Sequence, residues 1–228
     1  MTETVGVVPA LDMERRWIGD PAPLVEVSGI GARRARDASR LLVDRGASAL
    51  VSWGVAGGLD PELSAGTVVL PDAVIRGDGQ RVEVDLEWRD RLVDRILGQI
   101  NLSTAPVLTV DRPLASPGEK SEAHQRTGAG AVDMESAAVA SVAAGAGVPF
   151  ITVRVVVDTA DMGLPASATS LCDESGWLNL GSALRLVFRP GDWAGLAALA
   201  RANAAAGRAM RTVWAMARPD LALSEDIQ

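Results

Sequence analysis

The chain has 228 residues, enough for one large domain, and its 48% of hydrophobic residues can build a substantial core. Because 22 basic residues oppose 29 acidic ones, the net charge of −7 excludes a global positive field for nucleic acid and favours a small neutral or organic ligand. The single cysteine, Cys172, excludes an internal disulfide, and with one histidine in the chain we expect no metal site and a reducing, cytoplasmic location.

Apolar, β-branched runs alternate with segments of helical spacing, beginning with a first strand in MTETVGVVPALDMERRW, which has no basic segment typical of a signal peptide. This alternation predicts a single α/β domain over residues 1–228, with a central mixed, mostly parallel sheet flanked by helices. No apolar stretch reaches the roughly 20 residues that span a bilayer. The expected strands are Val5–Val8, Leu24–Val27, Ala49–Trp53, Thr67–Leu70, Ala105–Val110 and Phe150–Val157, and the expected helices are Arg33–Arg45, Leu86–Ile100, Glu135–Ala146 and Leu178–Phe188.

A last helix is expected at about 192–217, because Pro190-Gly191 interrupts the chain and Asp192 is a good N-cap. From Arg189 to Arg218 there are five arginines and one acid, a local excess of positive charge. This helix either packs on the core with a solvated basic face or makes a peripheral membrane contact. Its apolar side is expected to consist of Trp193, Leu196, Leu199, Val213 and Trp214.

Two glycine-rich segments, SGIGARRARDA from Ser28 and SWGVAGGLDP from Ser52, follow expected strands. Each either presents backbone amides to an anion or a sugar hydroxyl, or forms a tight strand-to-helix turn. A dinucleotide fingerprint needs a small residue where Arg34 stands, and no Gly-Lys-Ser/Thr follows either segment. The sequence therefore argues against Rossmann and P-loop nucleotide sites.

Three acids lie at expected strand ends, where open α/β sheets place their ligands: Glu14, Glu135 and Asp158. The helix dipole accounts for an acid such as Glu135 at a helix start. Asp158 differs, because it ends the almost wholly apolar run FITVRVVVD. We expect Asp158 to be partly desolvated at the edge of a cleft, with a raised pKa, and able to donate a proton.

Four motifs in order, VGVVPALDME, SGIG, GVAGGLDPELSAGTVVLPD and VDMESAAVASVAAGAGVPFITVRVVVD, resemble the nucleoside phosphorylase and nucleosidase superfamily that includes the methylthioadenosine/S-adenosylhomocysteine nucleosidases. The resemblance covers roughly residues 3–160 and implies a three-layer sandwich fold and no cofactor. The ending LRLVFRPGDWAGLAALARANAAAGRAM is similar to the hopanoid-associated phosphorylases, which remove adenine from adenosylhopane.

Residue roles follow from this resemblance. Met134 should pack on the sugar and base, Glu135 should accept hydrogen bonds from ribose hydroxyls, and Asp158 should protonate or hydrogen-bond N7 of the purine. Glu14 should activate or position the nucleophile. A proton donor at the purine suits a reaction whose leaving group gains negative charge, and carboxylates near the ribose suit an oxocarbenium-like transition state. Further substrate-binding residues implied by the resemblance are Gly57, Val132, Pro113 and Leu114.

The nucleophile is either water or inorganic phosphate as a co-substrate. The resemblance places Gly31, Val55 and Arg154 at this part of the site, and phosphate would need backbone amides and arginines there. The phosphorylase-type arginine is absent, since Ser52-Trp53-Gly54 stands in its place, and Val55 replaces a serine. Because Glu14 would repel phosphate, hydrolysis is favoured.

Several further residues have a less specific expected role. Pro113 and Leu114 stand where relatives have a purine-stacking aromatic, so aliphatic packing is expected there. Asp133 is expected as a cap or support, Asp111 as a strand-end cap or a ligand, and His124 as a solvated residue in a polar helical segment. The stretch from Asp161 reads as a loop over the 5′ substituent, with apolar contacts from Leu164, Leu171 and Trp177 and with Cys172 as a packing residue.

The leading hypothesis is an enzyme that cleaves the N-glycosidic bond of a purine nucleoside with a bulky apolar 5′ group, adenosylhopane in hopanoid biosynthesis. The alternatives are a methylthioadenosine/S-adenosylhomocysteine or futalosine nucleosidase, and a non-catalytic nucleoside-binding module. Joint retention of Glu14, Glu135 and Asp158 opposes the last of these, because a binding module does not need a leaving-group acid. By resemblance, a homo-oligomer, a homodimer in the simplest case, is expected.

Overall fold

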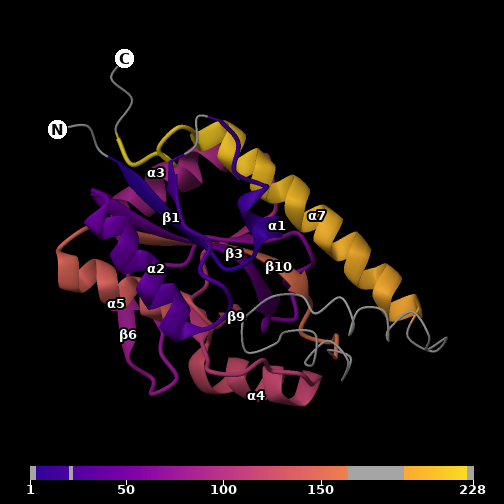
Figure 1. The fold of residues 1–228 in the computed structure, drawn as a ribbon. Coiled ribbons are helices and arrows are strands. Elements are labelled where there is room, and N and C mark those ends of the chain that lie inside the picture. The colour runs from indigo at the N-terminus through magenta and orange to yellow at the C-terminus, as the bar shows by residue number, and fades with distance from the viewer. Residues whose placement is uncertain (1–3, 21–22, 164–192, 225–228) are drawn as a thin grey trace.

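The computed structural model describes residues 4–20, 23–163 and 193–224, which form a central sheet flanked by helices (Figure 1). Within these ranges the strands are β1 (Val5–Pro9), β2 (Leu24–Val25), β3 (Ala49–Gly58), β4 (Val68–Val69), β5 (Ala73–Ile75), β6 (Arg81–Glu83), β7 (Leu102–Ser103), β8 (Val107–Thr109), β9 (Ala131–Asp133) and β10 (Phe150–Asp158). The helices are α1 (Asp12–Arg15), α2 (Ala32–Asp44), α3 (Leu86–Ile96), α4 (Pro117–Thr127), α5 (Ser136–Ala146) and α7 (Trp193–Ala217).

The sheet is mixed and mostly parallel, which confirms the expected fold class. Its strand order is β6-β5-β8-β9-β3-β10-β4-β7, and β1 pairs with β3 and with β2. The pairs β3–β9, β10–β4 and β5–β6 are antiparallel, and the other pairs described are parallel. The long strands β3 and β10 pair in register until a bulge between Val156 and Asp158 shifts the alignment. This bulge lies at the end of β10 that carries the candidate acid.

Helices cover both faces of the sheet, so the molecule has three layers (Figure 1). On one face α2 and α5 pack together through small and branched side chains such as Ala38, Leu42 and Ala143. On the other face α3 and α7 contribute Trp88 and Trp214 to the largest cluster of buried side chains. Burial of these apolar surfaces from both sides explains why the central strands are hydrophobic along almost their whole length.

The helix α7 begins at Trp193, one residue after the expected start of the C-terminal helix. Over the part whose side chains are described, α7 buries Val213 and Trp214 against the core, while Arg201, Arg208 and Arg211 are exposed. This matches a packed helix with a solvated basic face, and a membrane contact stays a prediction.

In the described part of the chain, no helix combines the length and hydropathy needed to cross a membrane. The expected helix Leu178–Phe188, the cap Asp192 and the side chains of Trp193, Leu196 and Leu199 lie outside the described residues.

Two expectations about local structure were wrong. The segment SWGVAGGLDP is not a turn after Trp53, because β3 continues to Gly58 and its glycines pair with β9 and β10. The third helix ends at Ile96, short of Ile100, because Leu97 has an extended conformation and Gly98 follows with a φ of 77°. The turn in SGIG was predicted correctly, and it leads into α2 at Ala32.

Candidate active site

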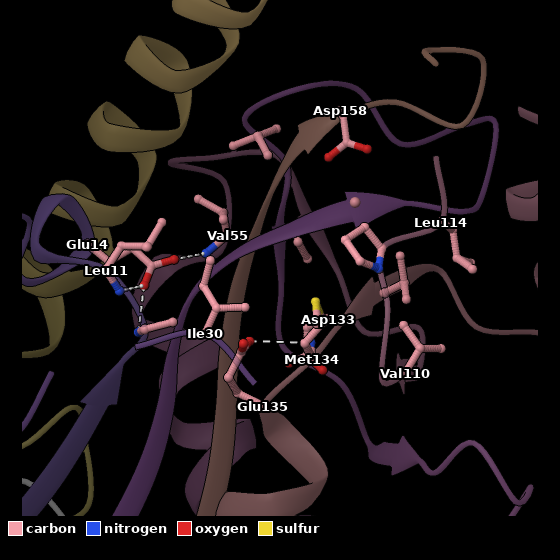
Figure 2. Close-up of a pocket in the computed structure, with 16 residues that line it drawn as sticks. Leu11, Glu14, Ile30, Val55, Val110, Leu114, Asp133, Met134, Glu135 and Asp158 are labelled. Atoms are coloured by element: carbon pink, nitrogen blue, oxygen red, sulfur yellow. Dashed lines mark hydrogen bonds between the residues drawn. The ribbon is translucent and has the colours of Figure 1, made fainter. Parts of the chain in front are cut away.

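A cavity of about 170 Å³ opens beside the carboxyl ends of β1, β3 and β10, and the antiparallel strand β9 with the residues after it forms another part of its wall (Figure 2). None of the 16 described residues that line it is aromatic, and most are aliphatic. Figure 2 shows Glu14 and Val55 on one side and Val110 and Leu114 on the other, with Met134 between them. The lining residues are Ala10, Leu11, Glu14, Ile30, Val55, Ala56, Gly57, Val110, Pro113, Leu114, Val132, Asp133, Met134, Glu135, Val157 and Asp158.

Glu14 is 1% exposed, although it lies in the short helix directly after β1. Its Oε2 accepts hydrogen bonds from the amides of Ala10 at 2.7 Å and Leu11 at 2.8 Å, and its Oε1 accepts one from Val55 at 2.9 Å. The indole N–H of Trp53 donates to the carbonyl of Glu14 at 3.3 Å. Burial raises the pKa of Glu14, although nearby Arg154 and the three amides oppose this. The side chain is a fixed carboxyl group suited to accept a proton.

Arg154 is 1% exposed in β10 and lies behind the acids. Its Nη2 is 2.7 Å from Asp133 Oδ2, 2.7 Å from Ser52 Oγ and 3.6 Å from Glu135 Oε2. Burial alone would lower the pKa of Arg154, but the carboxylates around it raise it. Arg154 itself does not line the cavity, so it acts on the site through its acidic partners.

Asp133 ends β9 and is confirmed as a cap and support. Its carboxylate accepts hydrogen bonds from the hydroxyl of Thr109 at 2.7 Å and from the amide and hydroxyl of Ser136, the first residue of α5. Its ion pair with Arg154 joins this cap to β10. The pairing aligns the start of α5 with the sheet and so determines where the next acid lies.

Glu135 is the N-cap residue of α5, and its side chain turns back toward the loop before α2. Its Oε1 accepts a hydrogen bond from the amide of Gly31 at 2.8 Å. Burial raises the pKa of Glu135 to about 7, with Arg154 lowering it and Asp133 raising it. Gly31 was expected to offer its amide to the nucleophile, but the structure gives that amide to Glu135, and Gly31 does not line the cavity.

Asp158 lies at the end of β10 after the bulge and lines the cavity. Burial raises its pKa, as the sequence predicts, and the neighbouring Lys120 opposes this. The Nζ of Lys120 is 2.6 Å from Asp158 Oδ2, and the lysine side chain is fully buried. Lys120 was not among the expected site residues, because it lies in a polar helical segment 38 residues before Asp158 in the sequence. One signal was available, since Lys120 is the only lysine in the chain.

Nine of the eleven site residues expected from the sequence line this one cavity, and Gly31 and Arg154 do not. His124 was expected to be solvated, but it is half-buried, with Nδ1 2.8 Å from the carbonyl of Ala129. Asp111 is exposed and does not line the cavity. Among the described residues, no group of three or more His, Cys, Asp or Glu side chains could bind a metal ion. The expected loop contacts Leu164, Leu171, Cys172 and Trp177 lie outside the described residues.

The chain is similar in sequence to a known protein family and to individual proteins within it. The profile of a family described as the phosphorylase superfamily matches residues 5–177. A 5′-methylthioadenosine/S-adenosylhomocysteine nucleosidase of Mycobacterium bovis is 28% identical over 177 residues, covering 60% of this chain and 69% of the relative. The enzyme of the same name from Tolumonas auensis is 29% identical over 165 residues, covering 61% and 70%.

Two solved structures have a similar fold. That of a 5′-methylthioadenosine/S-adenosylhomocysteine nucleosidase of Colwellia psychrerythraea in complex with adenine has a TM-score of 0.63 and 22% identity, covering 71% of this chain and 84% of that one. The futalosine hydrolase of Helicobacter pylori has a TM-score of 0.65 and 19% identity, covering 81% and 97%. At these identities the structural likeness concerns the fold alone.

Gly54 offers a direct test of how closely Glu14 and Arg154 approach each other. A Cβ at this position would meet the Glu14 carboxylate and lie 2.8 Å from Arg154 Nη1. We expect Gly54→Ala to lower the free energy of unfolding by about 1–3 kcal/mol in chemical denaturation, because the cluster is fully packed. Gly145→Ala in α5 is the control, since no atom lies within 4 Å of its added Cβ. Equal stabilities of the two variants would contradict the described packing.

The raised pKa of Glu135 predicts a pH-dependent stability. The pKa of Glu135 is near its ordinary value of 4.5 in the unfolded state and about 7 in the folded state, so this group lowers stability as pH rises between these values. Glu135→Gln removes the effect. The melting temperature of the variant relative to the unaltered protein should therefore increase from pH 5 to pH 8 in thermal scans. A difference that stays constant over this range would show that Glu135 ionises normally.

Proposed function

The chain belongs to the phosphorylase superfamily, and we propose that it is a nucleosidase that cleaves the N-glycosidic bond of an adenine nucleoside. One observation carries this proposal: a single cavity places Asp158 at one strand end and Glu14 and Glu135 at others. The names of the sequence relatives, which are nucleosidases for methylthioadenosine and S-adenosylhomocysteine, support the choice of adenine nucleosides.

Asp158 is the proposed acid for the leaving group. When the bond between C1′ and N9 breaks, its electron pair goes to the base, and a proton delivered to N7 neutralises the charge that develops there. The burial that raises the pKa of Asp158 favours the protonated form that this step needs. Pro113 and Leu114 line the same cavity and supply aliphatic contacts to the faces of the purine.

Glu135 and Met134 are the proposed ribose contacts. Glu135 lines the cavity while Gly31 and Arg154 position its carboxyl group, so its free acceptor capacity can serve ribose hydroxyls. Negative charge in this cluster also favours the oxocarbenium-like sugar of the transition state. Because the reaction needs only a nucleophile, an acid and these electrostatic contacts, we propose that it uses no cofactor.

Water is the proposed nucleophile, with Glu14 as its base. The amides of Ala10, Leu11 and Val55 already donate to Glu14, and the Arg154 guanidinium is paired with acids and serine hydroxyls. A phosphate ion would have to displace these carboxylates or lie beside them at a cost in repulsion. Water needs no positive site, and Glu14 can take its proton as the bond to C1′ forms.

Adenosylhopane is the substrate that we propose within this class. The aliphatic side chains of Leu11, Ile30 and Val157 in the cavity wall suit an apolar 5′ group, and the C-terminal segment resembles hopanoid-associated phosphorylases. Methylthioadenosine, S-adenosylhomocysteine and futalosine are the alternative substrates, favoured by the names of the relatives and of one structural neighbour. The homodimer and the cytoplasmic location stay predictions.

An assay of base release tests this proposal. We expect the protein to release adenine from adenosylhopane at a rate that does not change when phosphate is added, with free ribosyl product and no sugar phosphate. Chromatography of the base and ³¹P NMR of the sugar provide the measurement, with methylthioadenosine, S-adenosylhomocysteine, futalosine and adenosine as comparison substrates. Release from none of these nucleosides would refute the nucleosidase proposal, and a phosphorylated sugar would refute water as the nucleophile.

Asp158→Asn tests the leaving-group acid. The amide cannot deliver a proton to the purine, so turnover should decrease by about 10²–10⁴-fold, while adenine binding in calorimetry stays measurable. Asp161→Asn is the matched control, because Asp161 is an exposed acid three residues further along, hydrogen-bonded to Thr159. Full activity of the Asp158 variant would remove this residue from the mechanism.

A further inference from the structure

Lys120 has an unusual place in both the sequence and the structure. The chain has 22 basic residues, and 21 of them are arginines, so Lys120 is the only lysine. Among the described residues, the other basic side chains are mostly at the surface, whereas Lys120 is fully buried. A buried ammonium is costly unless it is paired and hydrogen-bonded. Lys120 lies outside all four of the sequence motifs that resemble the superfamily.

The Nζ atom of Lys120 lies among three oxygen atoms. Nζ lies 2.6 Å from Asp158 Oδ2, 2.7 Å from the carbonyl oxygen of Thr159 and 2.9 Å from that of Met162. The two carbonyl oxygens only accept, and an ammonium group has a third donor left for Asp158 Oδ2. An arginine could not satisfy them in the same way, because its donors lie in a plane at the end of a longer side chain.

The location of Lys120 connects the acid to a rigid element. The helix α4 begins with a capping box in which Ser116 and Glu119 bond each other's backbone amides, and Lys120 follows in the next position. Through its Nζ, α4 is joined to the end of β10 and to the segment that follows it, residues 159–162. The acid is therefore braced by a helix that is itself fixed at its start.

We propose that Lys120 is a positioning residue for Asp158, which directs the acid proton toward the base and stabilises the carboxylate formed when that proton leaves. This proposal rests on the proposed nucleosidase function. Because an ammonium group only donates, Oδ2 must accept from it, and the acid proton must reside on Oδ1. Lys120 thus selects which oxygen of Asp158 carries the proton.

Cleavage of the C1′–N9 bond moves one proton from Asp158 to the base and one from water to Glu14. Asp158 Oδ1 gives its proton to N7, the electron pair of the C1′–N9 bond moves to adenine, and a carboxylate remains beside the Lys120 ammonium. On the sugar side, water bonds to C1′ and gives a proton to Glu14. Exchange with solvent after product release returns one proton to Asp158 and removes one from Glu14.

The electrostatics around Asp158 predict how the pH profile responds. Burial raises the pKa of Asp158, and among the described residues Lys120 is the only charged side chain that acts against this. The neighbours on the adjacent strands, Gly57 and Val132, carry no charge. Activity that needs the protonated acid is lost as pH rises through this pKa. Removing the ammonium should therefore move the basic limb of the profile to higher pH.

A double-mutant cycle with pH profiles tests the proposal. Lys120→Met should lower kcat by about 10- to 100-fold with little change in KM, and should move the basic limb of kcat/KM upward. Lys120→Arg, which keeps the charge, should leave the limb near its original pH and restore part of kcat. In an Asp158→Asn background, Lys120→Met should change kcat less than about twofold, because no acid remains to position. An unmoved limb, or an equal loss in both backgrounds, would overturn the role of Lys120.

A second measurement decides the case if Lys120→Met fails to fold. Selective ¹⁵N-lysine labelling gives one Nζ resonance, since the chain has one lysine. This resonance should shift in Asp158→Asn and on addition of adenine to the unaltered protein. A resonance that responds to neither would overturn the positioning role. Absence of turnover by the unaltered protein would refute the proposed function itself, whereas normal turnover with an unresponsive Nζ would refute the role of Lys120 alone.

Discussion

The site depends on one buried guanidinium. Arg154 lies among Asp133, Glu135 and Glu14, and without its charge the burial of three acids so close together would be strongly unfavourable. The ion pair with Asp133 joins the start of α5 to β10, and the approach to Glu135 directs that acid to the cavity. Gly54 supplies the space that Glu14 and Arg154 need. The acids can therefore face an apolar cavity while they are almost fully buried.

The strand β10 connects the two halves of the proposed chemistry. Arg154 lies within it beside the acids of the sugar half, and Asp158 ends it after a bulge, where Lys120 provides a second buried cation. On the sugar side, Arg154 lies beside several buried carboxyl groups, and on the base side Lys120 lies beside one, that of Asp158. Burial raises the pKa values of Glu14, Glu135 and Asp158. Arg154 opposes this increase at the two glutamates, and Lys120 opposes it at Asp158. This balance suits groups that exchange protons during one reaction cycle.

Long-range contacts mark the limit of what the sequence could predict. Asp158 and Glu14 were found because each is an acid that follows an apolar strand, a local signal. Lys120 was missed because its partner is 38 residues away, and Gly31 was assigned to the nucleophile because sequence cannot show that Glu135 takes its amide. Six strands with long apolar runs were predicted. The strands β5, β6, β7 and β9 were not predicted, because each has two or three residues and lies in no long apolar run, and their pairing depends on tertiary structure.

In the proposed reaction, one cavity binds adenine at Asp158 and water, not phosphate, at Glu14. A crystal structure obtained with adenine in phosphate buffer tests both parts of this proposal. We expect N7 of adenine within hydrogen-bond distance of Asp158, Lys120 still paired with that acid, and an ordered water beside Glu14. A phosphate ion coordinated near Arg154 in place of that water, or adenine bound with N7 directed away from Asp158, would contradict it.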